Sequence, residues 1–142
     1  MDNYYDTSLR MYNSSKTLHI FDDYHNSCYL AGYVIECYAK IILGLHYNID
    51  AIQLRRNYSH KLDIMDTQFN YIVASSSYSE YMVDMILDFP NITTGSQRWD
   101  PIKRYINHPN QWTDINSKDY QNEMEVAMEK IAKMKVDGFN LI

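Results

Sequence analysis

Apolar residues recur at spacings of three and four along most of this chain, and this spacing places them on one face of an α-helix. Three such stripes are Leu62, Met65, Phe69 and Ile72; Tyr78, Met82, Met85 and Phe89; and Tyr120, Met124, Ala127, Ile131 and Met134. No segment shows the strict alternation of apolar and polar residues that is typical of a half-buried strand. The pattern therefore predicts an all-α fold, an up-and-down bundle in which each helix buries its apolar stripe.

We expect about five helices in a single domain, because 142 residues are enough to bury one core. The predicted helices cover residues 4–22, 25–45, 60–72, 78–89 and 117–137. Ser59 is the predicted N-cap of the third helix, and Pro90 is expected to end the fourth. Gly138 suits the position after the last helix, where a left-handed backbone is common. Residues 46–59 are predicted to be a polar loop.

The segment 91–116 has no long helical pattern, and we expect it to be an ordered loop before the last helix. Loops of this length are usually functional or disordered. Trp99 and Trp112 carry large apolar surfaces that would anchor this one to the bundle. Asp100 followed by Pro101 predicts a short helix that reaches about Asn107, since this pair favours a helix start.

The second predicted helix is almost entirely apolar from Ala31 to Leu43, but it contains Glu36 and Lys40. These two residues are four apart, so they share one helix face and can form an ion pair. Charges inside a buried helix must be paired, reach the rim or serve a site. The sequence alone leaves two interpretations open: an internal ion pair that orders the bundle, or part of a functional site.

The chain has a formal net charge of −5. It therefore lacks the overall basic field that drives non-specific nucleic-acid binding, and any RNA contact needs a local basic patch or a basic partner. The two cysteines, Cys28 and Cys37, lie on about opposite faces of one predicted helix, which excludes a disulfide between them. No metal-binding motif or phosphate-binding glycine loop is visible, so we expect no metal and no cofactor.

The N-terminal residues are polar and acidic, without the pattern of a secretory signal. The run from Cys28 to Leu45 approaches the length of a membrane span. Glu36 and Lys40 at its middle make a buried core helix the better interpretation. We therefore expect a cytoplasmic protein with no membrane partner.

The residues around this helix resemble the HEPN domain family, whose name stands for higher eukaryotes and prokaryotes nucleotide-binding. The matching residues are Ala31, Gly32, Glu36 and Lys40 in an apolar helix, followed by a loop that ends in Ser59, His60, Lys61 and Leu62. The resemblance covers the first half of the chain well and the second half loosely. There, the run from Arg98 to Tyr105 resembles the Arg-Tyr-(Asp)-Pro element of HEPN proteins that accompany nucleotidyltransferases.

The resemblance implies a homodimer and a metal-independent endoribonuclease, because many HEPN domains cut RNA in a cleft between two subunits. Their usual motif is an arginine, four to six further residues and a histidine. The arginine would hold the scissile phosphate and the imidazole would transfer protons. This chain departs from the motif, since three residues separate Arg104 from His108 and nine separate Arg98 from His108. Arg55 and His60 have four residues between them, but they precede the third predicted helix.

The candidate catalytic residues are Arg98 and Arg104 for the phosphate, and His108 and His60 for proton transfer. Glu36, Lys40, Lys103 and Tyr105 are candidates for substrate binding or for a structural role. We expect Arg98, Arg104 and His108 to face one cleft, with His60 and the charged helix nearby. The alternative for each is structural, since histidines often bond to helix ends and arginines often pair with acidic residues.

Three functional hypotheses follow. The first is an RNA-targeting or nucleotide-binding HEPN protein of a prokaryotic toxin-antitoxin or antiviral defence system, acting as an endoribonuclease. The second is a non-catalytic dimeric HEPN module whose partner, such as a nucleotidyltransferase, performs the chemistry. The third is a helical interaction protein that binds no nucleic acid. The resemblance favours the first two, whereas the acidic charge and the altered motif favour the last two.

Overall fold

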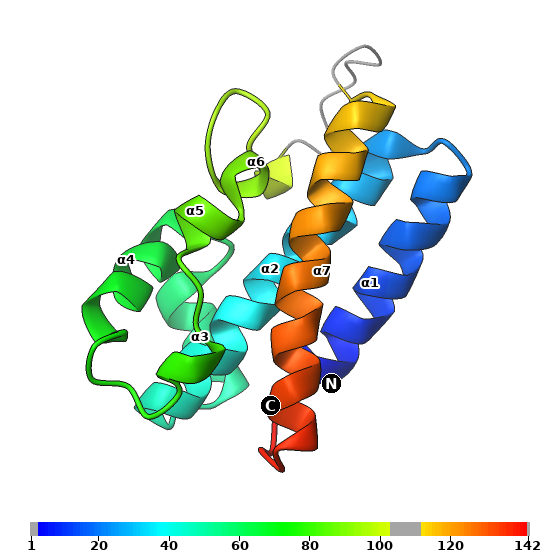
Figure 1. Cartoon of the computed structure of the whole chain (residues 1–142). Coiled ribbons are helices and arrows are strands. Elements are labelled where there is room, and N and C mark those ends of the chain that lie inside the picture. The colour runs from blue at the N-terminus through cyan, green and yellow to red at the C-terminus, as the bar shows by residue number, and fades with distance from the viewer. Residues whose placement is uncertain (1–2, 103–111, 142) are drawn as a thin grey trace.

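A computed structural model describes residues 3–102 and 112–141, and within these residues the fold is all-α (Figure 1). The elements are α1 (Tyr4–Ile20), α2 (Tyr24–Tyr47), α3 (Ala51–Tyr58), α4 (Leu62–Ile72), a 3₁₀ turn η1 (Ser79–Tyr81), α5 (Met85–Asp88), α6 (Pro90–Thr93) and α7 (Asp114–Val136). The described part of the chain thus has seven α-helices rather than the five expected. The prediction of an all-α fold is confirmed.

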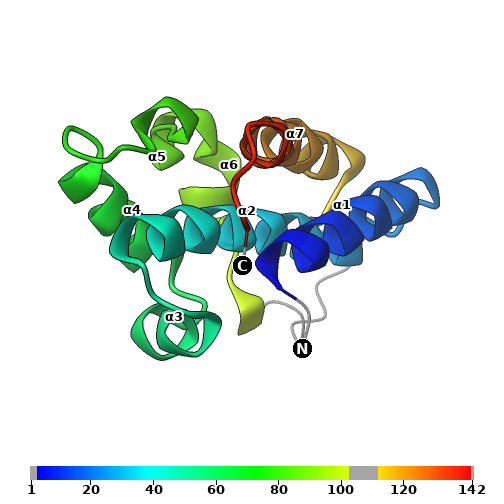
Figure 2. The same ribbon diagram turned by 90° about the horizontal axis from the view of Figure 1, so that it is seen from below.

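Helix α2 occupies the centre of the molecule, with α1 and α7 packed along one side and α3 to α6 along the other (Figures 1 and 2). From Ala31 to Gly44, every residue except Tyr33 is buried. Such a helix, apolar all round, forms the core of the bundle. Among the described helices, α2 alone is long and apolar enough to span a membrane, and 78% of its apolar stretch is buried inside the bundle.

The long helices begin at residues whose side chains cap their first turns. Asn3, Asp23 and Thr113 accept hydrogen bonds from backbone N–H groups in the first turns of α1, α2 and α7. These bonds satisfy donors that a helix start leaves unpaired. Gly138 follows α7 with φ of +94°, which confirms its predicted left-handed position. The expected bounds of these three helices differ from the observed ones by a few residues.

Helix α3 lies inside the segment that we expected to be a loop. Asp50 and Gln53 form a reciprocal capping box at its start. Only Leu54 and Tyr58 are buried, so the apolar stripe is too short to reveal the helix. Ser59, the predicted N-cap of the next helix, instead ends α3, and α4 begins after Lys61.

The single helix expected over residues 78–89 is wrong, because the chain there forms η1 and α5, and α6 follows from Pro90. Asp84 accepts hydrogen bonds from the N–H groups of Ile86 and Leu87, which starts a new short helix. Pro90 then becomes the first residue of α6, where a proline costs no hydrogen bond. Tyr81, Met85 and Phe89 are buried nonetheless, so the apolar stripe marked core positions correctly.

The two tryptophans of the segment 91–116 are buried, as predicted for its anchors. Trp112 packs parallel to the His25 ring and edge-on to Tyr120. The short helix expected from Pro101 onward falls mostly outside the described residues. Lys103, Arg104, Tyr105 and His108 also lie outside the described residues.

Candidate functional site

The carboxylate of Glu36 lies between two basic side chains in the middle of α2. The Nζ atom of Lys40 is 2.7 Å from Oε1 of Glu36, which confirms the predicted ion pair. Nδ1 of His60, from the loop between α3 and α4, lies 2.9 Å from Oε2 and 3.1 Å from Oε1. Glu36 and Lys40 are buried, whereas the His60 side chain is 48% exposed. The ion pair is therefore internal, and the histidine connects it to the surface.

The contact with Glu36 fixes the protonation pattern of His60. An ionised carboxylate only accepts hydrogen bonds, so Nδ1 of His60 must carry a proton and donate it. In the neutral ring, Nε2 is then the acceptor, and it makes no hydrogen bond to the described residues. A histidine oriented in this way by a buried carboxylate is suited to accept a proton at Nε2.

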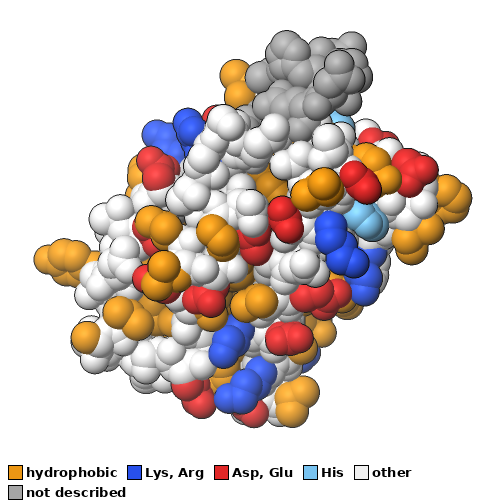
Figure 3. All heavy atoms as spheres, turned by 45° about the horizontal axis from the view of Figure 1, so that its top comes forward, with side chains coloured by type: hydrophobic (Ala, Val, Ile, Leu, Met, Phe, Trp, Pro, Cys, Tyr) orange, Lys and Arg blue, Asp and Glu red, His pale blue; other side chains and the backbone are white. Residues whose placement is uncertain are grey.

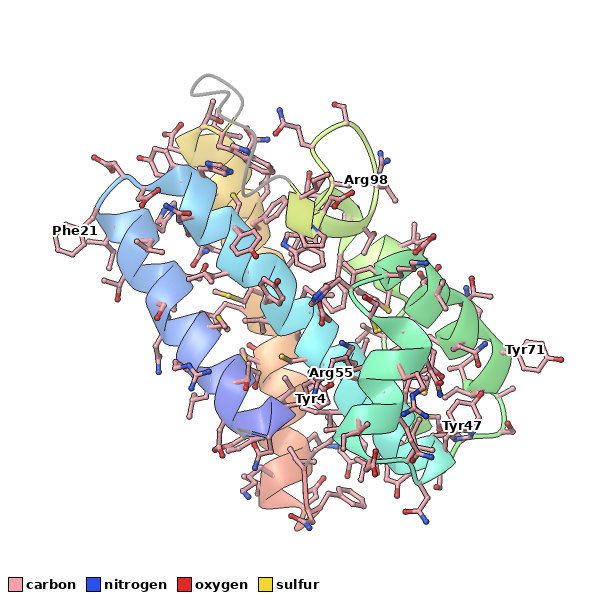
Figure 4. The ribbon with its side chains drawn as sticks, turned by 180° about the vertical axis from the view of Figure 1, so that it is seen from behind. Tyr4, Phe21, Tyr47, Arg55, Tyr71 and Arg98 are labelled. Carbon is pink, nitrogen blue, oxygen red and sulfur yellow. The ribbon has the colours of Figure 1, made fainter. Side chains whose placement is uncertain are left out.

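The aromatic ring of Tyr4, at the start of α1, packs against the buried Lys40 ammonium. The Lys40 ammonium lies 5.5 Å from the centre of the Tyr4 ring. Burial raises the pKa of the Tyr4 hydroxyl, and the nearby acidic groups Cys37 and Glu36 raise it further. The positive charge of Arg55 on α3 acts in the opposite direction. Figure 4 shows Arg55 beside Tyr4 on the back of the molecule.

The loop that carries His60 has an unusual backbone conformation. Ser59 has φ of +50° and ψ of −123°, a region that side chains other than glycine rarely adopt. Strain of this kind persists only where the surrounding structure enforces it, and it is concentrated at functional sites. Here the turn at Ser59 directs His60 towards Glu36.

Helix α4 starts beside His60 without a side-chain cap, because Lys61 makes no capping hydrogen bond. The first intrahelical bond runs from the N–H of Met65 to the carbonyl of Lys61. The N–H groups of Leu62, Asp63 and Ile64 therefore have no acceptor among the described residues. Exposed N–H groups at a helix start carry partial positive charge and favour anions.

A groove of about 490 Å³ runs between this loop and the segment that precedes the undescribed residues. One wall contains His60, Lys61 and Asp63, and the other contains Arg98, Trp99 and Asp100. The structure thus brings Arg98 and His60 to one groove, whereas Glu36 and Lys40 lie behind His60 rather than on the groove wall. Figure 4 shows Arg98 at the upper loop on the same side of the molecule as Arg55.

The position of Arg98 depends on its neighbour Trp99. The indole N–H of Trp99 donates to the carbonyl oxygen of Tyr29 at 2.9 Å, and its backbone N–H donates to the carbonyl of Ile92 at 2.7 Å. The hydroxyl of Tyr120 donates to the carbonyl of Gln97. Arg98 itself donates from Nη1 to the carbonyl of Gly95 at 3.2 Å. Three of these contacts hold the loop against α2, α6 and α7, and the fourth, from Arg98 to Gly95, lies within the loop.

Gly32 is the residue on α2 that allows this packing. A β-carbon at position 32 would lie 2.0 Å from the Trp99 ring, which no real contact permits. In the sequence, Gly32 stood out only as part of a family pattern, and its contact with Trp99 was not predicted. The usable signal was a glycine inside an apolar helix, which often marks a close approach of another group.

The groove has mixed charge. His60, Lys61, Arg98 and the uncapped end of α4 favour an anion, whereas Asp63 and Asp100 oppose one. Across the face in Figure 3, acidic and basic side chains are interspersed and no broad basic field is present. Within the described residues, no group of three or more His, Cys, Asp or Glu side chains is placed to hold a metal ion. Comparisons with protein-family models, curated proteins and solved structures find no match to this chain.

Proposed function

We propose that this chain is a HEPN-like RNA-binding domain whose groove binds a phosphodiester, with His60 as the proton-transfer residue of a metal-independent endoribonuclease. The observation that carries the proposal is the groove shared by Arg98 and by a histidine that a buried carboxylate orients. The family resemblance of Ala31, Gly32, Glu36 and Lys40 supports the same assignment.

The chemistry requires RNA because the attacking group is the 2′-hydroxyl. Nε2 of His60 takes the proton of that hydroxyl while its oxygen bonds to phosphorus. The bond from phosphorus to the 5′-oxygen breaks, and the leaving oxygen takes a proton from water. The products are a 2′,3′-cyclic phosphate and a 5′-hydroxyl. Arg98 and the N–H groups at the start of α4 stabilise the charge that develops on the phosphoryl oxygens.

The test is cleavage of a mixed-sequence RNA by the purified protein in EDTA. Arg98→Ala should lower the rate about 100-fold, the effect of losing one preorganised donor to the transition state. His60→Ala should lower it by about 100-fold or more, since general base catalysis is lost. His46→Ala is the control for His60, because His46 also makes one side-chain hydrogen bond, to Ser76 at 3.0 Å, and lies outside the groove.

Equal cleavage by wild type, His60→Ala and Arg98→Ala would remove the groove as the catalytic site. A substrate with 2′-deoxyribose should remain uncut. Absence of any RNA binding by the wild type would reject the proposal.

A non-catalytic dimeric module that partners a nucleotidyltransferase is the second candidate. Asp63 and Asp100 in the groove favour it, because two carboxylates beside a phosphate weaken its binding. A wild type that binds RNA without cutting it, with an affinity that Arg98→Ala leaves unchanged, would support this candidate over the endoribonuclease.

Both candidates include a homodimer. A second groove, of about 600 Å³ between α1 and α2, is lined mainly by the apolar and aromatic side chains of Met11, Leu18, Tyr29, Leu30 and Tyr33. We expect a second copy of the chain to cover it, since apolar and aromatic side chains of this kind are enriched in interfaces. Light scattering should give twice the chain mass of 16.9 kDa, and Leu30→Glu should shift the protein towards the monomer. A wild-type protein that stays monomeric at all concentrations would contradict this.

A further inference from the structure

We propose that the RNA strand extends from the groove across α3, where Arg55 and Arg56 bind the phosphates that flank the cleaved one. This inference rests on the proposed function, because it adds a second part to the same binding site. It concerns a surface to which the sequence analysis gave no role.

The segment that contains α3 is locally basic. From residue 51 to residue 62 there are three Lys or Arg side chains and His60, and there is no acidic residue. Arg55 and Arg56 occupy the last turn of α3 and are exposed. The acidic cap of this helix, Asp50, lies at its opposite end.

The arginines are close in the chain to the groove wall. His60 and Lys61 line the groove and follow α3 after a single intervening residue, Ser59. The Cα atoms of Arg55 and His60 can be at most about 18 Å apart, because each residue spans no more than about 3.6 Å. A single RNA strand with one phosphate between Arg98 and His60 is therefore within reach of α3 through its neighbouring phosphates.

Single-stranded nucleic acid is commonly bound by a positively charged track combined with aromatic side chains. Tyr4 lies beside Arg55 (Figure 4) and is half-buried. This surface therefore suits a short single strand rather than a duplex, and it would bind the strand without base-specific contacts.

The experiment compares two 2′-O-methyl RNAs, which bind but cannot be cleaved: a dinucleotide and a strand of about 12 nucleotides, within the site sizes typical of single-strand binders. The affinities are measured over a range of salt concentrations. The variant is Arg55→Gln with Arg56→Gln, which preserves helix propensity. The matched control is Lys118→Gln with Lys130→Gln, which removes the same charge from α7, a helix that does not line the groove.

The arginine variant should reduce the ratio of the affinity for the long strand to the affinity for the dinucleotide. The slope of log affinity against log salt for the long strand should fall by about 1.4, since each lost phosphate contact contributes about 0.7. The lysine control should leave ratio and slope unchanged. A ratio that the arginine variant does not alter, with wild-type binding intact, overturns this inference alone. A wild type that binds neither RNA overturns the proposed function as well.

Discussion

Lys40→Met is expected to lower the free energy of unfolding by about 3 kcal/mol, at the lower end of the range for breaking a buried ion pair. The reason is that Glu36 stays buried without its main counter-charge. The hydrogen bond from Nδ1 of His60 to the carboxylate, at 2.9 Å, remains in the variant and offsets part of this cost. Urea unfolding of the variant and the wild type measures the difference.

The double variant Glu36→Leu with Lys40→Met should be close to the wild type in stability. Replacing both members of a buried pair by apolar residues avoids the cost of an isolated charge and is often neutral or stabilising. His60, which is half-exposed, can then bond to water. If the double variant were less stable than Lys40→Met alone, the ion pair would contribute net stability and this account of it would fail.

Trp99→Ala is the second large effect, with an expected loss of about 3 kcal/mol or more, as for a buried aromatic side chain replaced by alanine. Trp99 is 6% exposed, and its indole N–H donates to the carbonyl of Tyr29. Gly32→Ala alone should cost about 1–3 kcal/mol, because the added carbon overlaps the indole ring.

The two changes should be strongly coupled. In the Trp99→Ala background, Gly32→Ala should stabilise the protein by up to about 1 kcal/mol, since the ring is absent and alanine favours the helix over glycine. A double-mutant cycle by urea unfolding measures this coupling. Additive losses would show that Gly32 and Trp99 do not contact each other.

How far the sequence predicted this fold depended on the length of each helix. Helix α2 was predictable because it is almost entirely apolar from Ala31 to Leu43, and α7 because its stripe extends over about four turns. Helix α3 buries only two side chains and left no readable stripe. The prediction of one helix over residues 78–89 was wrong because the Asp84 side chain caps a new helix inside this range. The apolar spacing nevertheless identified buried residues correctly.

The candidate site was predictable only where its contacts are local. The spacing of Glu36 and Lys40 within one helix predicted their ion pair. The contact of Glu36 with His60 spans 24 residues, and it depends on the unusual backbone of Ser59, which no propensity predicts. The shared groove of Arg98 and His60 depends in turn on the packing of Trp99 against Gly32, which only the tertiary structure reveals.

The proposed function requires a phosphodiester to bind where Arg98, His60 and the start of α4 meet. The most direct measurement is an NMR titration of the ¹⁵N-labelled protein with the 2′-O-methyl dinucleotide. We predict that the largest shifts occur in the backbone amides of Leu62, Asp63 and Ile64 and in the side-chain N–H of Arg98, and that Arg98→Ala removes them. Absence of shifts, or shifts confined to residues outside this groove, would contradict the account.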